Sequence, residues 1–181
     1  MIYFIADTHF SDDAIRRYEN RPYENVREMN ENMIANWNSV VTDADQVYVL
    51  GDFGALVYCD KSGDSIDILA RLNGAKYLVK GNHDTESNEY YRQAGFAEVY
   101  DKPVILDCFW ILSHEPLYVC ENMPYANLFG HVHNSPLYRD YSAQHYCVSV
   151  ERIGYRPISF AEVAACVKRG KGNMLGEHHE N

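Results

Sequence analysis

The sequence contains no long apolar run, and none of its segments approaches the roughly 18 to 20 residues that a membrane-spanning helix needs. Its start, MIYFIADTHF, also lacks the charged segment and the cleavage site of a secretory signal. We therefore expect a cytoplasmic protein with no membrane partner.

Cysteine is sparse and widely scattered. The five cysteines form no C-x-x-C pair of the kind found in structural zinc sites and redox motifs. Because a free cysteine behaves as a small hydrophobic residue, we expect reduced and mostly buried thiols. The residues concerned are Cys59, Cys108, Cys120, Cys147 and Cys166.

Positive charge is in short supply, since 16 Lys and Arg residues stand against 26 Asp and Glu residues. The formal net charge of −10 at pH 7 disfavours long duplex nucleic acid as a partner, because an acidic surface repels a polyanion. A nuclease would in addition need a basic groove for the strand. The acidity could also reflect a cation site, because several carboxylates kept close together can hold cations.

The sequence does contain a series of short runs rich in apolar and β-branched residues, which predict strands. Between the first two, apolar residues recur every three or four positions and predict a helix on the core. That helix carries Val26, Met29, Met33, Ile34, Trp37, Val40 and Val41. The predicted strands are Ile2 to Ala6, Gln46 to Leu50, Lys76 to Lys80, Pro103 to Leu106, Cys108 to Leu112, Asn127 to Phe129 and His145 to Val150.

Three further helices are predicted from their end signals. Glycine favours the turn that ends a helix, and a serine followed three residues later by glutamate forms a capping box at a helix start. The predicted helices run from Ser65 to Leu72 before Gly74, from Ser87 to Ala94 before Gly95, and from the capping box of Ser159 and Glu162 to Gly170.

Strands and helices alternate early in the chain, and strands gather later. This order predicts an α/β fold of two packed mixed β-sheets flanked by helices, parallel in the first half and more antiparallel in the second. With 46% hydrophobic and 23% charged residues, we expect one domain over residues 1–170. Residues 171–181 are expected to be a flexible tail; His178 and His179 could bind metal there, but a frayed end is the simpler interpretation.

Residues that bind metals follow the predicted strands wherever one ends. The carboxyl ends of strands in open α/β sheets are where ligand sites form, so we expect these segments to converge on one pocket. They are Asp7-Thr8-His9, Gly51-Asp52, Gly81-Asn82-His83-Asp84, Ser113-His114-Glu115-Pro116 and Gly130-His131-Val132-His133.

The residue types restrict which ion could bind. Carboxylate, amide and imidazole without thiolate suit Mn, Fe, Zn or similar ions, and match neither an all-oxygen calcium site nor a Cys-rich zinc site. In an extended segment Asp7 and His9 would point the same way, as would His131 and His133. A glycine before Asp52, and likewise at two other strand ends, lets the backbone approach the cluster without a Cβ clash.

The ordered set D-x-H, G-D, G-N-H-D, H and G-H-x-H, over residues 7 to 133, resembles the calcineurin-like metallophosphoesterase superfamily. A single G-D or a lone histidine is a worthless signal, whereas all the pieces in order, each after a strand-like run, are specific. The opening DTHF, the following RYENRP and Ala35-Asn36-Trp37-Asn38 further resemble small bacterial and phage members. The resemblance implies two β-sheets packed between helices.

The resemblance also implies a role for each residue at the strand ends. His83 would contact substrate instead of metal, and Asp84 would orient its ring. Two divalent ions are implied, one held by Asp7, His9 and His133, the other by Asn82, His114 and His131, with Asp52 bridging both.

The chain departs from many relatives after Asp52. Phe53-Gly54-Ala55-Leu56 stands where the protein-phosphatase branch has a further acid and an arginine. This difference argues against a phosphoprotein substrate.

Each residue alone has an ordinary structural explanation, such as a cap at Asp7, a core position for His9 or a turn at Asn82. Together these explanations would leave acids and imidazoles in a packed interior at a desolvation cost of several kcal/mol. Metal removes that cost.

Arg16, Arg17 and Arg21 follow the first motif. Arginine binds phosphate in a bidentate way, so Arg17 and Arg21 in particular are candidates for substrate binding; a solvated surface is the alternative.

The sequence therefore predicts a dinuclear metal-dependent phosphoesterase in which a metal-activated bridging hydroxide attacks a small phosphodiester, nucleotide or phosphomonoester. Mn is the ion expected to support activity in vitro. The alternatives are a scaffold or binding module with the same fold, and a nuclease. His83 separates an enzyme from a scaffold, because a scaffold needs no imidazole facing substrate. The sequence carries no signal for a particular oligomeric state.

Overall fold

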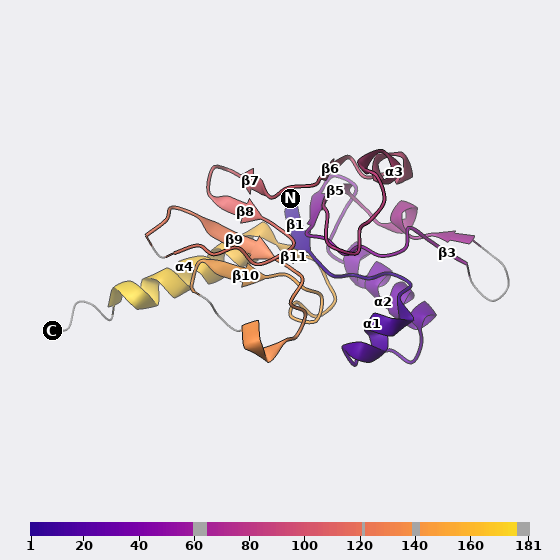
Figure 1. Ribbon diagram of the computed structural model, residues 1–181, viewed down its shortest axis with the longest axis horizontal. Helices are drawn as coiled ribbons and strands as arrows, with labels where there is room; N and C mark the ends of the chain where they lie inside the picture. Colours follow the sequence, from indigo (N-terminus) through magenta and orange to yellow (C-terminus); the bar gives the residue numbers. More distant parts are fainter. Residues whose placement is uncertain (60–64, 121, 139–141, 177–181) are drawn as a thin grey trace.

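Two mixed sheets with flanking helices make up the fold (Figure 1). The computed structural model describes residues 1–59, 65–120, 122–138 and 142–176. Among these residues no helix is both long and apolar enough to cross a bilayer.

The first sheet has the strand order β11-β1-β2-β5-β6. Four of its strands are parallel, and β11 pairs with the edge of β1 in the antiparallel sense. The carboxyl ends of β1, β2 and β5 therefore meet at one edge. The strands are β1 (Ile2–Ile5), β2 (Gln46–Val49), β5 (Ala75–Val79), β6 (Glu98–Tyr100) and β11 (Ile158–Ser159).

Alternate residues of the first sheet face two different cores. Tyr3 and Ile5 join a buried cluster with helix α2 (Val26–Asn38), whereas Phe4 and Ala6 join the cluster shared with the second sheet. The predicted apolar stripe of α2 is confirmed, since its buried residues include Met29, Met33, Ile34 and Trp37. A short helix, α1 (Asp13–Tyr18), precedes α2 in the connection from β1 to β2.

The second sheet has the order β10-β9-β8-β7. Antiparallel pairing in the second half of the chain is confirmed for β7 with β8 and for β11 with β1, whereas β8, β9 and β10 are parallel to one another. The strands are β7 (Val104–Leu106), β8 (Trp110–Leu112), β9 (Ala126–Phe129) and β10 (His145–Cys147).

Backbone hydrogen bonds join the two sheets at the end of β1. The Ala6 N–H donates to the Val148 carbonyl at 2.9 Å, and the Val150 N–H donates to the Ala6 carbonyl at 3.1 Å. Ala6 and Ser149 thus form an isolated parallel bridge beyond β1 and β10. This bridge brings the carboxyl ends of both sheets together.

The helix predicted from Ser65 to Leu72 is wrong. Strand β4 (Ser65–Asp67) pairs antiparallel with β3 (Val57–Cys59), and only a 3-10 turn, η1 (Leu69–Arg71), follows. Long-range strand pairing satisfies the backbone here and overrides the local helical pattern. The helix predicted after Ser87 is confirmed as α3 (Asn88–Ala94), which ends at Gly95 with φ +123°.

The terminal helix α4 (Phe160–Gly176) begins at the predicted capping box and packs on the core shared by the sheets. The Ser159 N–H donates to Glu162 Oε2 at 3.0 Å, and the Glu162 N–H donates to Ser159 Oγ at 3.3 Å. The predicted stop at Gly170 is wrong, because glycine inside a helix costs only about 1 kcal/mol. His178 and His179 lie outside the described residues.

The prediction of mostly buried thiols is wrong for the described cysteines. Cys108 is exposed, while Cys120, Cys147 and Cys166 are partly exposed. Cys108 occupies the turn between β7 and β8 with φ +55°, a position at the surface rather than in a strand interior. The Cys59 side chain lies outside the described residues.

Candidate metal centre

The residues predicted to bind metal lie together at the joint carboxyl edge of the two sheets. Each follows a strand that runs parallel to at least one neighbour in its sheet, so the carboxyl ends of these strands bring their side chains to one place. Asp7 and His9 follow β1, Asp52 follows β2, Asn82 follows β5, His114 follows β8, and His131 and His133 follow β9.

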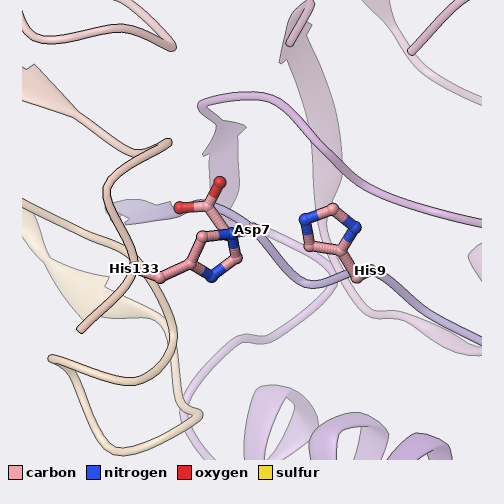
Figure 2. Close-up of side chains that lie close together, drawn as sticks. All are labelled: Asp7, His9 and His133. Carbon is pink, nitrogen blue, oxygen red and sulfur yellow. The ribbon is translucent and has the colours of Figure 1, made fainter. Parts of the chain in front are cut away.

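Asp7, His9 and His133 form the first group of donors. One potential ligand atom from each lies within 4.8 Å of the others. Figure 2 shows a ring nitrogen of His133 beside the Asp7 carboxylate, with the His9 ring across from both. The His9 and His133 rings are stacked with their centroids 5.3 Å apart. The group could hold one divalent ion.

His114, Asn82 and His131 form the second group. His114 Nε2 lies 2.9 Å from Asn82 Oδ1 and 3.1 Å from His131 Nδ1. The other nitrogen of His114, Nδ1, lies 2.9 Å from the Leu50 carbonyl, to which it can only donate. This bond directs Nε2 toward the group.

Asp52 lies between the two groups. Its Oδ2 atom is 3.5 Å from His9 Nε2 and 3.4 Å from His114 Nε2. Asp7, Asp52 and His114 also form a group with donor atoms within 4.8 Å of one another. A single carboxylate thus faces donors of both groups.

Burial shifts the pKa values of the charged groups at the centre strongly. Burial raises the pKa of Asp7 to about 6, and burial lowers the pKa of His9 to about 4 although the Asp52 carboxylate opposes that change. His9 Nε2 is buried and has no hydrogen-bond partner among the residues that the structure describes. A polar atom without a partner is costly in an interior, and a cation would provide one. The donor set and this unsatisfied nitrogen fit a divalent metal ion.

Asp52 and His114 form a charged pair, and the pKa of each group is set by burial and by its partner. Burial raises the pKa of Asp52, but the hydrogen bond and positive charge of His114 outweigh it and lower the pKa to about 2. Burial lowers the pKa of His114, but the carboxylates of Asp52 and Asp7 outweigh it and raise the pKa to about 9.

The prediction of extended segments at the paired motifs is wrong. Asp7 and His9 have φ values of 57° and 46°, and Asp52, His131 and His133 have φ values of 54°, 68° and 45°. These are left-handed conformations, which cost non-glycine residues of the order of 1 kcal/mol or more each. Such strain persists only where the surroundings impose it, and it gathers at functional sites.

The close approach predicted at the glycines is confirmed. A Cβ atom on Gly81 would lie 2.2 Å from Asp52 Oδ1, and one on Gly51 would lie 2.3 Å from His114 Nδ1. Any side chain at either position would displace a residue of the centre.

The prediction that Asp84 orients His83 is wrong in its geometry. The buried Asp84 carboxylate accepts hydrogen bonds from the backbone N–H groups of Asp52, Phe53 and Gly81 at 2.7, 3.1 and 2.9 Å. Asp84 therefore holds the loops after β2 and β5 together.

His83 lies at the exposed rim of the centre. Its backbone N–H donates to Asp52 Oδ1 at 2.8 Å, and its ring stands edge-on to the His9 ring with centroids 5.2 Å apart. The imidazole is therefore accessible to a molecule bound at the centre.

Arg21 was a candidate for substrate binding, and the structure contradicts this. Its side chain is fully buried and donates to Glu151 Oε1 at 2.7 Å and to the carbonyls of Asp7 and Thr8 at 2.6 and 2.7 Å. An exposed phosphate cannot reach it. Arg17 is exposed, and its guanidinium pairs with Asp13 on α1.

Arg16 also pairs with Asp13, at 2.7 Å, and donates to the Tyr23 carbonyl at 2.8 Å. Its guanidinium thus fixes the loop after α1.

Glu151 is a residue of the site that the sequence interpretation missed. Its buried carboxylate lies 3.2 Å from His133 Nδ1. The other donors were identified because they follow apolar runs that predict strands. Glu151 also follows such a run, the one that contains β10, so the sequence carried the same signal for it.

Known proteins resemble this chain in sequence and in fold. The family model of the calcineurin-like phosphoesterases matches residues 1–155. An uncharacterized protein of Methanocaldococcus jannaschii is 33% identical over 174 residues, which cover 94% of this chain and 93% of that protein. The crystal structure of a protein of unknown function from Aquifex aeolicus has a TM-score of 0.68 at 27% identity, covering 91% of this chain and 98% of that one. The chain belongs to the calcineurin-like phosphoesterase family.

Proposed function

We propose that the protein is a dinuclear metal-dependent phosphoesterase that hydrolyses a small phosphodiester, nucleotide or phosphomonoester. Membership of the family supports metal-dependent hydrolysis of phosphoesters. The observation that carries the finer proposal is the position of Asp52, whose carboxylate lies within 3.5 Å of His9 Nε2 and of His114 Nε2. A scaffold would not need donors of two groups around one acid.

In this proposal Asp52 is a ligand shared by two ions. The ions, when bound, supply Lewis-acid polarisation of phosphoryl oxygens and a water-derived nucleophile at neutral pH. Mn²⁺ is the ion we expect to support activity in vitro. The first ion would be held by Asp7, His9 and His133, and the second by Asn82, His114 and His131.

We assign to His83 a hydrogen bond to the leaving-group oxygen. Asn82, the preceding residue, directs its Oδ1 atom at His114 and His131, at 2.9 and 3.0 Å. The exposure of His83 and its position beside His9 support a role on the substrate side. A positioned imidazole that protonates a leaving group contributes about 10² to 10⁴ in rate.

The acidity of the chain favours small esters as substrates. A net charge of −10 repels polyanions, which disfavours duplex nucleic acid. The segment after Asp52 lacks the further acid and the arginine of the protein-phosphatase branch, which disfavours a phosphoprotein substrate.

The test is hydrolysis of p-nitrophenyl phosphate and bis-p-nitrophenyl phosphate by purified protein with Mn²⁺, together with elemental analysis. We expect two ions per chain and turnover that a chelator abolishes. Two bound ions without turnover of either ester would favour the scaffold, and faster cleavage of single-stranded DNA than of either ester would favour the nuclease.

His83→Ala tests the role of the imidazole. We expect this variant to keep both ions and to lose about 10² to 10⁴ of its rate on alkyl esters, with a smaller loss on p-nitrophenyl esters, whose leaving group needs little protonation. Thr85→Ala, at an exposed position in the same loop, is the matched control and should behave as wild type. Loss of an ion from His83→Ala would contradict the assignment.

A further inference from the structure

Glu151 is a buried acid outside the predicted ligand set. Its side chain is only 4% exposed, and its Oε1 atom lies 3.2 Å from His133 Nδ1. Its other oxygen, Oε2, is buried and accepts no hydrogen bond from the described part of the chain. A buried carboxylate in contact with a ligand candidate needs a reason to be there, because its desolvation is costly.

Arg21 provides the opposing charge. Its Nε and Nη2 atoms donate to Glu151 Oε1 at 2.9 and 2.7 Å, and its side chain is 0% exposed. The remaining hydrogen bonds of the guanidinium go to the carbonyls of Asp7 and Thr8 and to the Met29 sulfur. Arg21 therefore contacts the loop after β1 and the acid behind His133 at once.

We propose that Glu151 is a positioning residue of the metal centre, which acts through His133 and is itself held by Arg21. This inference rests on the proposed function, because it requires that His133 bind an ion. Glu151 accepts the Nδ1 hydrogen of His133 and so leaves the Nε2 lone pair for the ion.

The orientation of the ring follows from the contacts. With Nδ1 directed at Glu151, the opposite edge of the His133 ring faces the Asp7 carboxylate, as Figure 2 shows. A carboxylate behind a histidine ligand fixes the ring and increases the basicity of the nitrogen that binds metal. The position of Glu151 is therefore that of a partner to the first ion, not to the second.

Arg21 links Glu151 to the loop after β1 and so connects donors from the two sheets. The carbonyl of Asp7 accepts from Arg21 at 2.6 Å, and Asp7 has a left-handed φ of 57°. The ligand loop after β1 and the ligand His133 after β9 are thus fixed by one buried ion pair. A change at Glu151 should weaken the first group of donors and leave the second group intact.

Glu19 offers a competing interpretation. Donor atoms of Glu19, His133 and Glu151 lie within 4.8 Å of one another, an arrangement that could hold a cation of its own. The Arg21 guanidinium already neutralises Glu151, so we assign this group to positioning. A third ion per chain that disappears in Glu19→Gln would overturn the proposal.

The experiment is calorimetric titration of Mn²⁺ into metal-free protein, which does not depend on activity. In Glu151→Gln we expect the dissociation constant of one ion to rise about 10- to 100-fold, the range typical when a supporting carboxylate is lost. The dissociation constant of the other ion should change less than about twofold. A merely structural role would lower stability without selecting one ion.

The matched control is Glu31→Gln on α2, which breaks an exposed ion pair with Arg71 of η1, at 2.7 Å. It should bind both ions as wild type does. If Glu151→Gln does not fold, Glu151→Asp keeps the charge for Arg21 but withdraws the acceptor from His133, and the same selective loss is expected.

The possible failures are distinguishable. Unchanged affinity for both ions in folded Glu151→Gln or Glu151→Asp, or equal weakening of both, would overturn the positioning role alone. Wild-type protein that binds no ion, or one ion only, would overturn the proposed dinuclear centre and this inference with it.

Discussion

The first sheet and the second sheet bring different atoms to the same place. The loops after β1, β2 and β5 supply the oxygen donors Asp7, Asp52 and Asn82 together with one imidazole, His9. The loops after β8 and β9 supply only imidazoles, among them His133. Neither sheet alone has a complete donor set for either of the two proposed ions. The centre is therefore a product of the packing between the sheets.

The two sheets also hold their loops by different means. In the first, the Asp84 carboxylate accepts from three backbone N–H groups. In the second, the buried Asn127 side chain accepts from the Leu117 N–H at 2.8 Å and donates to the Ile111 carbonyl at 3.0 Å. A charge supports the acidic half, and a neutral amide supports the imidazole half.

The largest effect is expected at the residue between the two groups. Asp52→Asn removes a charged oxygen near His9 and His114, and we expect kcat/KM on small esters to fall more than about 100-fold, beyond the loss typical of a supporting residue. Elemental analysis should show fewer ions per chain. Asp67→Asn is the control and should keep wild-type activity, because Asp67 is an exposed residue at the end of β4 whose carboxylate accepts from the Ala70 N–H. Full activity of Asp52→Asn would contradict the proposal that Asp52 is a ligand shared by two ions.

The next largest effect concerns Asp84 and Asn127, the residues that hold the loops of the first and second sheets. Asp84→Ala leaves two buried N–H groups and one partly buried N–H group without acceptors, and we expect a loss of about 4 kcal/mol in the free energy of unfolding. Asn127→Ala breaks neutral hydrogen bonds and should cost about 2 kcal/mol. Urea denaturation in the presence of a chelator measures both without the contribution of metal. A larger loss in Asn127→Ala would reverse the comparison.

A smaller effect concerns the pair that spans the sheets, Asp52 and His114. In metal-free protein the pKa of His114 is raised to about 9 in the folded state. Its stabilising effect is therefore complete below the unfolded pKa of about 6.5 and is lost as pH rises through about 9. We expect the melting temperature with chelator to fall between pH 6.5 and 9, and to fall less in Asp52→Asn. A flat profile in wild type would show that the pair does not form.

The smallest effect is expected at Arg17. Its guanidinium is exposed and pairs with Asp13, so Arg17→Ala should change kcat and KM for small esters by less than about twofold, since an exposed ion pair contributes little. Steady-state kinetics on both ester types would measure this. A rise in KM of tenfold would show that Arg17 leaves Asp13 to bind phosphate.

Several features of the molecule were predictable from the sequence because their causes are local. The stripe of Met29, Met33 and Trp37 predicted α2, and the Ser159 and Glu162 capping box predicted the start of α4. The donor residues could be found because they follow apolar runs and because parallel strand ends converge. The types of donor then restricted the ion.

Other features were decided only by the tertiary structure. The segment from Ser65 is a strand because β3 pairs with it, against its local helical pattern. Arg21 is not at the surface, because Glu151, 130 positions away in sequence, and the carbonyls of Asp7 and Thr8 surround it. Spacing along the chain contains no information about such partners.

Within the centre, too, some features were predictable from the sequence and others were decided by the tertiary structure, as Asp84 and the ligand loops show. In the G-N-H-D motif Asp84 is next to His83 in sequence. In the structure, however, its carboxylate accepts hydrogen bonds from three backbone N–H groups of two loops. Likewise Asp7 and His9 converge through left-handed turns and not through the alternation of an extended strand. The sequence by itself determined which chemical groups arrive at the sheet edge. Their orientations and supporting partners were decided by contacts between distant segments, which form only when the two sheets pack.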